Sequence, residues 1–509
     1  MPVMIDPGSG NHLMPLRSAR RVVVIIAVVA GCSAAFSPAG MSAVFAPRLG
    51  HVGRWITDRG RVVIVRGVNM VYKVPPYYPA AAGFGAGDAA FLEGLGFNVV
   101  RVGVIWKAVE PKPGVYDDGY LGHIASTVRT LARHGMFSLL DFHQDMYNEL
   151  FQGEGAPDWA VQDDGLPNPK NGFPGNYPTD PALQRAEDHF WADSPGPGGV
   201  GLQERYAAAW RHVAHMFRSI PGVLGYELLN EPSAGTQFAT CLGASGCQAF
   251  DAQLTAFDGR VASAIRTVDP HTLIFHEPDV GFDFGVATRV GALRHGPAGF
   301  AFHDYCLAAS PNGCASEPRG FTNALDHVAH THEALLLTEW GSNPYRGDLT
   351  GMMNLADRYM VPWIEWAYCP CNDPTGATPD PLVLDPAKPP VGANVGQLAL
   401  HTLVEPFPQL VAGTPLSWRY NRQTRTFQLR YSTAKASGDG RFAAGAITEI
   451  ATPRVIYGRP YAVHVQGGAI VSQPGARILE IAACPGARNL SVLVLRSGRD
   501  RESCRATQT

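Results

Sequence analysis

The sequence predicts an α/β fold, a (β/α)8 TIM barrel followed by a C-terminal antiparallel β-sandwich domain. From about residue 52 to 405, eight short apolar runs rich in β-branched residues alternate with longer segments of helical period. Such runs belong to a parallel sheet covered by helices, and eight parallel strands close a barrel. After residue 408 the helical period disappears and alternating strands take over, which is typical of a β-sandwich. We therefore expect the barrel over 50–407 and the sandwich over 408–509.

The individual elements follow from the same patterns. RWITDRGRVVIV (54–65), with its Asp-Arg-Gly turn, predicts a small hairpin that leads into the first barrel strand. The eight barrel strands are predicted at 61–69, 98–106, 136–145, 223–231, 272–278, 299–305, 334–341 and 361–368. Helical periods are clearest at 122–135, 202–220, 250–269 and 392–407. In the C-terminal domain, strands are predicted at 416–432, 449–458, 461–472, 478–484 and 490–497.

The connection between the third predicted strand and the helix near residue 202 is unusually long. It is rich in Gly, Pro, Asp and aromatic residues, and long connections in compact domains are usually functional. In a barrel it would emerge on the C-terminal face, where active sites lie. Its aromatic side chains either line an apolar wall there or pack the connection onto the barrel: Phe151, Trp159, Phe173, Tyr177, Phe190 and Trp191.

The N-terminal residues 1–45 are predicted to be an export segment. Arg17, Arg20 and Arg21 precede VVVIIAVVA (22–30), an apolar run too short to span a bilayer but typical of a signal-peptide core. Met14 is an alternative start. Val-Ala-Gly-Cys at 29–32 resembles a lipoprotein box, so the protein is expected to be secreted or attached to the cell envelope through Cys32. Ordinary cleavage further along the chain is the alternative.

Eight cysteines lie in close pairs along the chain, which predicts disulfides in an exported protein. The expected pairs are Cys241 with Cys247, Cys306 with Cys314, Cys369 with Cys371, and Cys484 with Cys504. The Cys-Pro-Cys pair at 369–371 is the least favourable of the four, because so short a loop strains the bridge.

Metal and nucleic-acid partners are not indicated. No metal is expected, because no Cys-x-x-Cys has a histidine at ligand spacing, and His327, His330 and His332 are interpreted as a solvated helix face. The 41 basic and 44 acidic residues are nearly balanced, which gives no indication of a nucleic-acid partner. We expect a monomer.

Polar residues recur where the predicted barrel strands end. Asn230 and Glu231 close the fourth strand, and Glu339 closes the seventh. A closed barrel brings these ends around one opening, where the two glutamates would face each other. One protonated and one ionised carboxyl group are what cleavage of a glycosidic bond requires.

Other strand-end residues fit the same chemistry. Arg101 and Tyr305 would hold one glutamate in its ionised form, while burial raises the pKa of the other. Asn230 is placed to bind a sugar 2-hydroxyl group, and Trp366 supplies an apolar platform for a sugar ring.

The set resembles the retaining (β/α)8 glycoside hydrolases of clan A, family five. Asn-Glu-Pro (230–232) and Thr-Glu-Trp-Gly (338–341) carry the resemblance over about 350 residues, together with Arg101, His143, His303 and Tyr305. By this resemblance Glu231 is the acid/base and Glu339 the nucleophile. VNMVYKVPPYYP, LLDFHQDMYNE and the insertion ending in HFW are similar to endoglycoceramidases, which release the glycan of a glycosphingolipid from ceramide. That resemblance implies that Lys73 and Asp145 bind sugar hydroxyls and that His143 supports the site.

The resemblance implies double displacement without a cofactor, on a glycosphingolipid reached by transient contact with a membrane or micelle. Two alternatives stay open. One is a glucanase, or a β-glucosidase acting on another apolar glycoside. The other is a non-catalytic protein that binds carbohydrate or lipid on a retired hydrolase barrel.

Overall fold

The structure is a computed structural model that describes residues 47–243, 246–458 and 460–504. The predicted export segment, including Cys32, lies outside these ranges. Within them, no helix combines the length and the apolar character needed to cross a bilayer.

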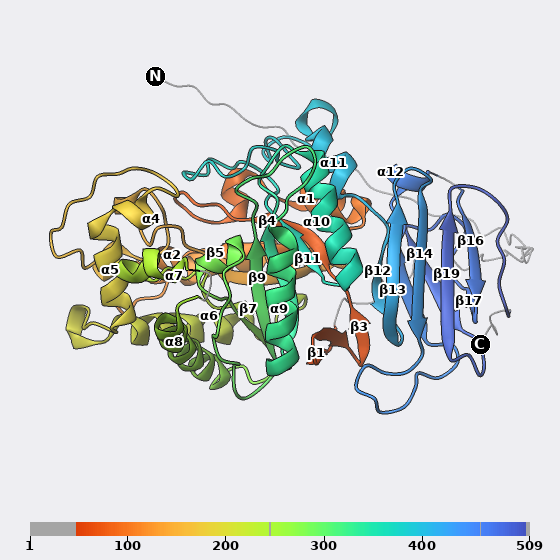
Figure 1. The fold of residues 1–509 in the computed structure, drawn as a ribbon, viewed down its shortest axis with the longest axis horizontal. Coiled ribbons are helices and arrows are strands. Elements are labelled where there is room, and N and C mark those ends of the chain that lie inside the picture. Colours follow the sequence, from red (N-terminus) through yellow and green to blue (C-terminus); the bar gives the residue numbers. More distant parts are fainter. Residues whose placement is uncertain (1–46, 244–245, 459, 505–509) are drawn as a thin grey trace, which may run out of the picture. The chain divides into compact units, whose positions relative to one another are not determined.

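Eight parallel strands close a barrel, in the order β10-β11-β4-β5-β6-β7-β8-β9. This arrangement confirms the predicted fold class (Figure 1). Each strand overlaps one of the eight predicted runs. All but one of their residues are buried, because helices cover the outside while side chains fill the inside. The strands are β4 (Arg66–Met70), β5 (Val99–Val104), β6 (Phe137–Phe142), β7 (Val223–Glu227), β8 (Leu273–His276), β9 (Ala298–Asp304), β10 (Ala334–Trp340) and β11 (Trp363–Glu365).

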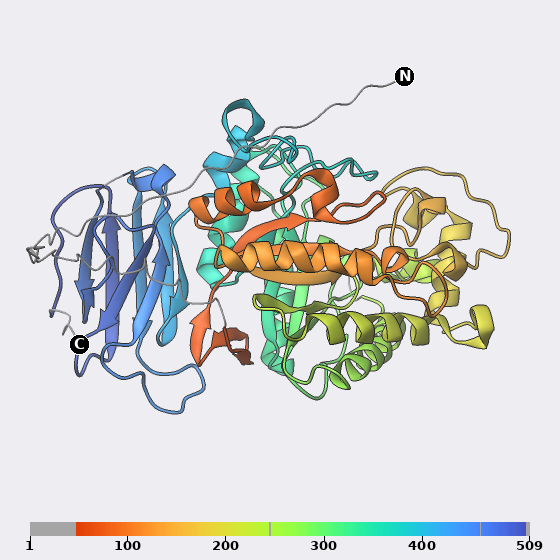
Figure 2. The same cartoon turned by 180° about the vertical axis from the view of Figure 1, so that it is seen from behind.

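Helices follow seven of the barrel strands. They are α1 (Ala86–Leu95), α2 (Trp106–Val109), α3 (Asp118–Arg133), α6 (Leu202–Phe217), α7 (Phe238–Cys241), α8 (Gln248–Arg266), α9 (Glu317–Thr331), α10 (Arg346–Tyr359) and α11 (Gln397–Leu403). Figure 2 shows α3, in orange, running along the outside of the barrel. After β8 the chain forms only a 3-10 helix, Val280–Phe284. This differs from the eight βα units expected, because glycine and proline interrupt residues 277–297.

The long connection after β6 has helices of its own. It contains α4 (Asn176–Thr179) and α5 (Pro181–Trp191). The Asp180 side chain caps α5 by accepting hydrogen bonds from the backbone of Ala182 (3.0 Å) and Leu183 (3.1 Å). Most of its aromatic residues pack it onto the barrel, since Phe151, Tyr177 and Phe190 are buried. Phe190 and Trp191 also line a cavity of about 30 Å³ together with Leu229 and Pro232, which flank Asn230 and Glu231 in the chain.

The C-terminal strands form two antiparallel sheets. The smaller has the order β13-β14-β19-β16, with β13 (Thr414–Asn421), β14 (Thr426–Ser432), β19 (Asn489–Leu495) and β16 (Ala462–Gln466) (Figure 1). The larger contains β12 (Phe407–Val411), β15 (Ile447–Ala451), β18 (Ile478–Ala483) and β17 (Gly468–Ile470). Trp418 and Leu429 of one sheet share a core with Ile450 and Ile481 of the other, as in a β-sandwich. Residues 449–458 are not strand throughout, because Pro453 precedes a short helix, α12 (Arg454–Tyr457).

The N-terminal hairpin belongs to this larger sheet. It consists of β1 (Leu49–Val52), β2 (Trp55–Asp58) and β3 (Arg61–Val63). The sequence predicts only that it leads into the barrel, yet β3 pairs antiparallel with β12, Val62 opposite Val411. Ile56 of β2 packs in the same cluster as Leu139 and Leu336 of the barrel strands. The larger sheet therefore combines strands from before and after the barrel, and a division at residue 408 separates strands that are hydrogen-bonded neighbours.

All four predicted cysteine pairs are bonded to each other in the structure. In the barrel, Cys241 bonds to Cys247 in the segment that precedes α8, and Cys369 bonds to Cys371 just after β11. Cys306 bonds to Cys314 between β9 and α9. In the C-terminal domain, Cys484 at the end of β18 bonds to Cys504. The Cys-Pro-Cys pair therefore forms a disulfide despite its short loop, because its Cα atoms are 5.2 Å apart, within the usual range for a bridge.

Candidate active site

Arg101, near the centre of β5, is the hub of the barrel opening. Its side chain is fully buried, and it points away from the apolar helix layer because side chains alternate along a strand. Its guanidinium group contacts Glu227, Glu339, Asp141 (3.1 Å), Glu277 (3.3 Å), Asn69 (3.1 Å) and Asn230 (2.8 Å). Burial lowers the pKa of Arg101, but its four carboxylates outweigh this and raise it well above the usual value. The opening therefore has a permanent positive charge at its base.

Two donors hold the Glu339 carboxylate near the end of β10. Arg101 Nη1 donates to Oε1, and the phenol of Tyr305 donates to Oε2 over 2.7 Å. Glu339 is buried, so neither donor competes with bulk water. The two bonds fix the orientation of the carboxylate at the opening, as a positioned nucleophile requires.

Glu231, after β7, has the opposite environment. Burial, followed by the charge of Asp145, raises its pKa to about 7, so the protonated form persists to near-neutral pH. Its backbone has φ = 42°, a left-handed conformation that is rare for a residue other than glycine. The Glu231 backbone N–H donates to Oε2 of Glu277 over 3.1 Å. That bond helps to hold the strained turn that brings Glu231 into the opening.

His303 of β9 lies between the two glutamates. Its Nδ1 is 2.9 Å from Oε1 of Glu231 and 3.8 Å from Oε2 of Glu339. Burial lowers the pKa of His303 to about 3, so its imidazole is neutral. One oxygen of each carboxylate and a nitrogen of His303 lie within 4.8 Å of one another. In retaining glycosidases the two carboxyl groups lie about 5–5.5 Å apart, and the arrangement here is compatible with that spacing.

A second cluster of polar side chains, around Lys73, adjoins the cluster around Arg101. Lys73 Nζ lies 2.6 Å from Asp145 and 3.3 Å from Asp373, and it sits 4.4 Å from the centre of the Trp366 ring. His143 stacks nearly parallel to Trp366, with ring centres 5.5 Å apart. The two clusters share Asp141, which is 2.7 Å from His143 Nδ1 and 3.1 Å from Arg101.

Asn230 uses most of its amide within the protein. Its Oδ1 accepts from Arg101 over 2.8 Å, and its Nδ2 donates to the carbonyl of Gln144 over 2.9 Å. An amide nitrogen has two N–H bonds, so one donor is left for a sugar hydroxyl.

The long connection after β6 supports the segment that follows Glu231. Trp191 Nε1 donates to the carbonyl of Ser233 over 2.6 Å, and the Ser233 hydroxyl donates to Glu187 over 3.0 Å. Both Trp191 and Glu187 belong to α5. The helix thus fixes the chain two residues beyond Glu231.

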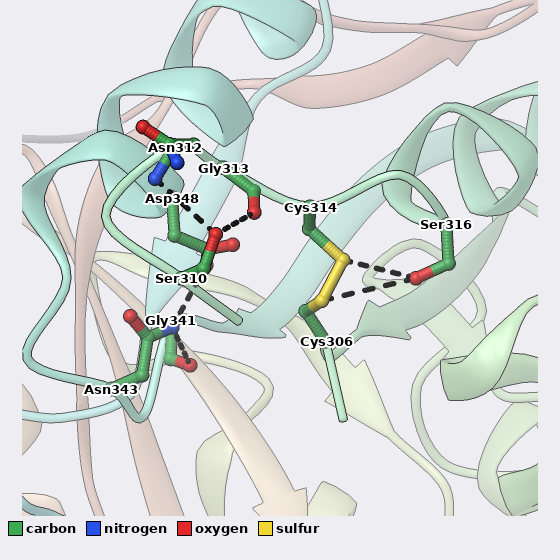
Figure 3. Close-up of a disulfide and its surroundings, with 9 residues drawn as sticks. All are labelled: Cys306, Ser310, Asn312, Gly313, Cys314, Ser316, Gly341, Asn343 and Asp348. Carbon is green, nitrogen blue, oxygen red and sulfur yellow. Dashed lines mark hydrogen bonds between the residues drawn. A yellow bond between two sulfur atoms is a disulfide. The ribbon is translucent and has the colours of Figure 1, made fainter. Parts of the chain in front are cut away.

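A disulfide fixes the loop that follows Tyr305. Cys306 directly follows Tyr305, and its bond to Cys314 closes a short loop (Figure 3). This loop packs on α10, where a β-carbon on Gly347 would lie 1.8 Å from the Pro311 carbonyl oxygen. Only glycine permits this approach.

The segment after Glu339 is fixed in the same region. Asn343 Nδ2 donates to the Gly341 carbonyl over 3.0 Å and to Asp348 over 2.8 Å (Figure 3). The chain is therefore tied down immediately after both Tyr305 and Glu339.

The structure brings the predicted residues together and adds some that the sequence reasoning missed. Glu277 and Glu227 both contact Arg101, and neither is among the predicted residues. Glu277 has a visible signal, since His-Glu-Pro (276–278) repeats the Asn-Glu-Pro pattern after an apolar run. Glu227 is a lone acid within the apolar VLGYELL segment, which is unusual for a buried strand.

Comparison with known families agrees with this geometry. The family description "Cellulase (glycosyl hydrolase family 5)" matches residues 86–372, which is more than half of the chain. The chain belongs to glycoside hydrolase family 5. A second description, "Glycoside hydrolase family 5 C-terminal domain", matches residues 406–492. This family 5 member is therefore a glycosidase, a hydrolase of O-glycosyl bonds.

Two relatives, one of them in two solved structures, extend the comparison. Endoglycoceramidase I of Rhodococcus hoagii is 30% identical over 460 residues, covering 86% of each chain. A lactosyl-enzyme intermediate of endo-glycoceramidase II from Rhodococcus sp. has a TM-score of 0.71 at 27% identity, covering 88% of this chain and 100% of that one. The ganglioside GM3 complex of the same enzyme has a TM-score of 0.70 at 26% identity, covering 87% and 98%.

Proposed function

We propose that the protein is a retaining endoglycoceramidase, which cleaves the β-glycosidic bond between the glycan and the ceramide of a glycosphingolipid. The observation that carries this proposal is the pairing of Glu231 and Glu339 around His303. The similarity to endoglycoceramidases over both domains supports the substrate class. The GM3 complex of a relative supports a sialylated glycan among the substrates.

In this proposal the reaction is a double displacement. Glu339 attacks C1 of the sugar attached to ceramide, and Glu231 donates its proton to the departing ceramide oxygen. Glu231, now ionised, removes a proton from water, and the resulting hydroxide attacks C1 and releases Glu339. Configuration at C1 is retained because it is inverted twice. The lactosyl-enzyme intermediate of a relative supports the covalent step.

The surrounding residues have separate roles in the proposal. Arg101 and Tyr305 hold the Glu339 carboxylate in position through the two bonds described above. His303 is neutral, so it adds no charge that would lower the pKa of the Glu231 acid. Lys73, Asp145 and Asn230 offer hydrogen bonds to sugar hydroxyls, while His143 supports the Trp366 platform.

We also infer that the protein is exported, either secreted or held at the cell envelope through Cys32. Four disulfides support this inference, because such bonds persist mainly outside the reducing cytoplasm. The arginines and apolar run near the N-terminus agree with it. An exported enzyme would meet its amphiphilic substrate by transient contact with a membrane or micelle. Fractionation of the producing cells, with mass spectrometry of the mature N-terminus, tests export and Cys32 lipidation.

Incubation with glycosphingolipids and with cellulose oligomers, read by mass spectrometry, tests the activity. Release of free ceramide together with an intact glycan is the expected result. Cleavage of cellulose oligomers alone would identify a glucanase, and stepwise release of monosaccharides would identify an exo-acting glucosidase. Binding without any hydrolysis would identify a non-catalytic protein.

Two variants test the assigned roles. Glu339→Gln and Glu231→Gln should each abolish most glycosphingolipid hydrolysis while the far-UV circular dichroism spectrum stays unchanged. A nitrophenyl glycoside needs no proton donor for its leaving group. Glu231→Gln should therefore release a burst of nitrophenol, whereas Glu339→Gln should not. Near-normal turnover of glycosphingolipid by either variant contradicts the assignment.

A further inference from the structure

A second cluster of histidines and carboxylates lies outside the barrel opening. His276 is the last residue of β8, and its neighbour Glu277 contacts Arg101 at the opening. Successive strand residues point to opposite sides, so His276 contacts the helix layer instead. There it meets Asp258 of α8, His327 of α9 and Glu333, the residue before β10. The exposed fraction of each of these side chains is below a tenth.

The structure corrects the sequence-based interpretation of His327. The sequence pattern places His327 on a solvated helix face with His330 and His332, without an acidic partner. His330 is exposed, but the His327 side chain is 7% exposed and lies 3.6 Å from Glu333. His276, more than fifty residues away in the chain, completes the group.

The atoms of this cluster converge as metal ligands do. His276 Nε2 is 3.2 Å from Oε1 of Glu333, and His327 Nε2 is 3.6 Å from Oε2. One ligand atom from each of the three residues lies within 4.8 Å of the other two. Tetrahedral zinc with bonds of about 2.0–2.1 Å places its ligand atoms about 3.3 Å apart. The two separations from Glu333, one to each of its oxygens, are close to that value, and the full set of three atoms lies within 4.8 Å.

Two further groups orient these ligands from behind. Asp258 Oδ2 is 3.4 Å from Nδ1 of His276, the ring nitrogen that faces away from Glu333. The backbone N–H of Leu293 donates to Oε1 of Glu333 over 2.8 Å. A histidine whose second nitrogen faces a carboxylate is the usual arrangement around protein-bound zinc.

The cluster also contains polar atoms without partners. His327 Nε2 and Glu333 Oε2 are buried and make no hydrogen bond with the described residues, which is costly in a protein interior. No lysine or arginine forms an ion pair with any of the four side chains in the described ranges. His276 Nε2 and Glu333 Oε1 are within hydrogen-bond distance of each other, so a divalent cation bound here would take the place of the proton between them.

We propose that His276, His327 and Glu333 bind a zinc ion, with Asp258 orienting His276. Three protein ligands leave one position of a tetrahedral ion for water. The ion would connect the end of β8, helix α9 and the start of β10, the strand that carries Glu339. Its role is to stabilise this part of the barrel wall, because binding to the folded state alone adds to stability.

Other acidic and histidine groups in the described residues are less suited to a cation. Lys73 already pairs with the carboxylates beside His143. Arg101 occupies the centre of the groups that contain His303. Cys306 and Cys314 are joined to each other. The cluster around Glu333 is distinguished by carboxylates that no lysine or arginine neutralises.

Calorimetric titration of chelator-treated protein with zinc chloride tests the proposal. A Cys32→Ser background removes a thiol that would bind zinc independently. We expect one zinc site per chain that both His327→Gln and Glu333→Gln abolish, and a rise in Tm with zinc that both variants lose. Asp258→Asn should weaken binding about 10- to 100-fold, as loss of such an outer partner typically does.

Two controls separate this site from others. His330→Gln changes an exposed histidine on the same helix, and Glu231→Gln changes the active site, so both should keep the full zinc stoichiometry. If Glu333→Gln does not fold, visible absorption of the cobalt-loaded protein and of the His327→Gln variant replaces it, since tetrahedral cobalt absorbs strongly. Absence of zinc binding in the folded protein, or binding that His327→Gln leaves intact, overturns the proposal.

Discussion

The phenol of Tyr305 donates a 2.7 Å hydrogen bond to Oε2 of Glu339, whose other oxygen contacts Arg101. Tyr305 stands directly before the Cys306–Cys314 disulfide, so its position is fixed by a covalent loop as well as by β9. The proposed nucleophile is therefore held by a donor whose own backbone has little freedom to move.

Tyr305→Phe should lower kcat/KM without unfolding the protein. The lost bond to a charged group is worth about 1.5–3 kcal/mol, which is roughly a 10- to 150-fold loss in rate. Steady-state kinetics on a soluble glycoside measures it. Tyr345→Phe changes a tyrosine that lies at the surface before α10 and should retain full activity. Equal losses in both variants would contradict a specific role for Tyr305.

The activity should fall as pH rises above about 7. Burial, then the charge of Asp145, raises the pKa of Glu231 to about 7, and a general acid works only in its protonated form. The alkaline limb of the kcat/KM profile should therefore report this group. Asp145→Asn removes one charge that raises this pKa, so the limb should move to lower pH even where sugar binding also weakens. The exposed substitution Asp164→Asn should leave the limb in place.

Glu187→Gln should make the protein more stable at alkaline pH. Burial raises the pKa of Glu187 to about 8, so the folded state holds this proton more tightly than the unfolded state does. The wild type therefore loses stability as pH rises from about 4.5 through about 8, by an amount on the order of a few kcal/mol. Glutamine keeps an oxygen that can accept the Ser233 hydrogen bond but does not ionise. Tm at pH 5 and pH 8 should differ less in the variant, whereas exposed Glu204→Gln should behave as wild type.

Asp357→Asn should destabilise the contact between the barrel and the C-terminal domain. Asp357 of α10 pairs with buried Arg66 at the start of β4 and accepts from Trp418 Nε1 of β13 over 2.7 Å. Asparagine can still accept from Trp418 but leaves the Arg66 charge uncompensated, which typically costs about 3–5 kcal/mol. Urea unfolding measures the loss, with Asp326→Asn on the exposed face of α9 as the control. An unchanged midpoint would show that Arg66 is stabilised by other groups.

Part of the site could be predicted because the carboxyl ends of all eight strands of a barrel surround one opening. Glu231, Glu339 and Arg101 each interrupt or end an apolar run, so the closed sheet alone brings them to one opening. Glu277 follows the same rule, and comparison of its His-Glu-Pro segment with Asn-Glu-Pro would have found it.

The disulfides could be predicted for a different reason. Each cysteine lies within a short stretch of chain from its partner, at most 20 residues in the case of Cys484 and Cys504. Proximity along the chain therefore decides the pairing, and no knowledge of the tertiary fold is needed.

Contacts outside the opening were not predictable in this way. His276, His327 and Glu333 meet because α9 is rotated so that His327 faces the barrel while His330 faces solvent. The sequence contains both histidines at adjacent turns and does not determine which one is buried. The pairing of β3 with β12 was not predictable either. The two strands are more than 340 residues apart in the chain, and at that separation the local sequence pattern carries no information on pairing.

That pairing has a consequence for biosynthesis. The hairpin of β1, β2 and β3 leaves the ribosome before the barrel strands, yet its partner strand β12 is made only after the whole barrel. The larger sheet of the sandwich thus cannot be completed until the whole barrel has been made. Neither half is a transferable module: grafting residues 408–509 onto another enzyme would leave the edge of β12 without the neighbour that covers it.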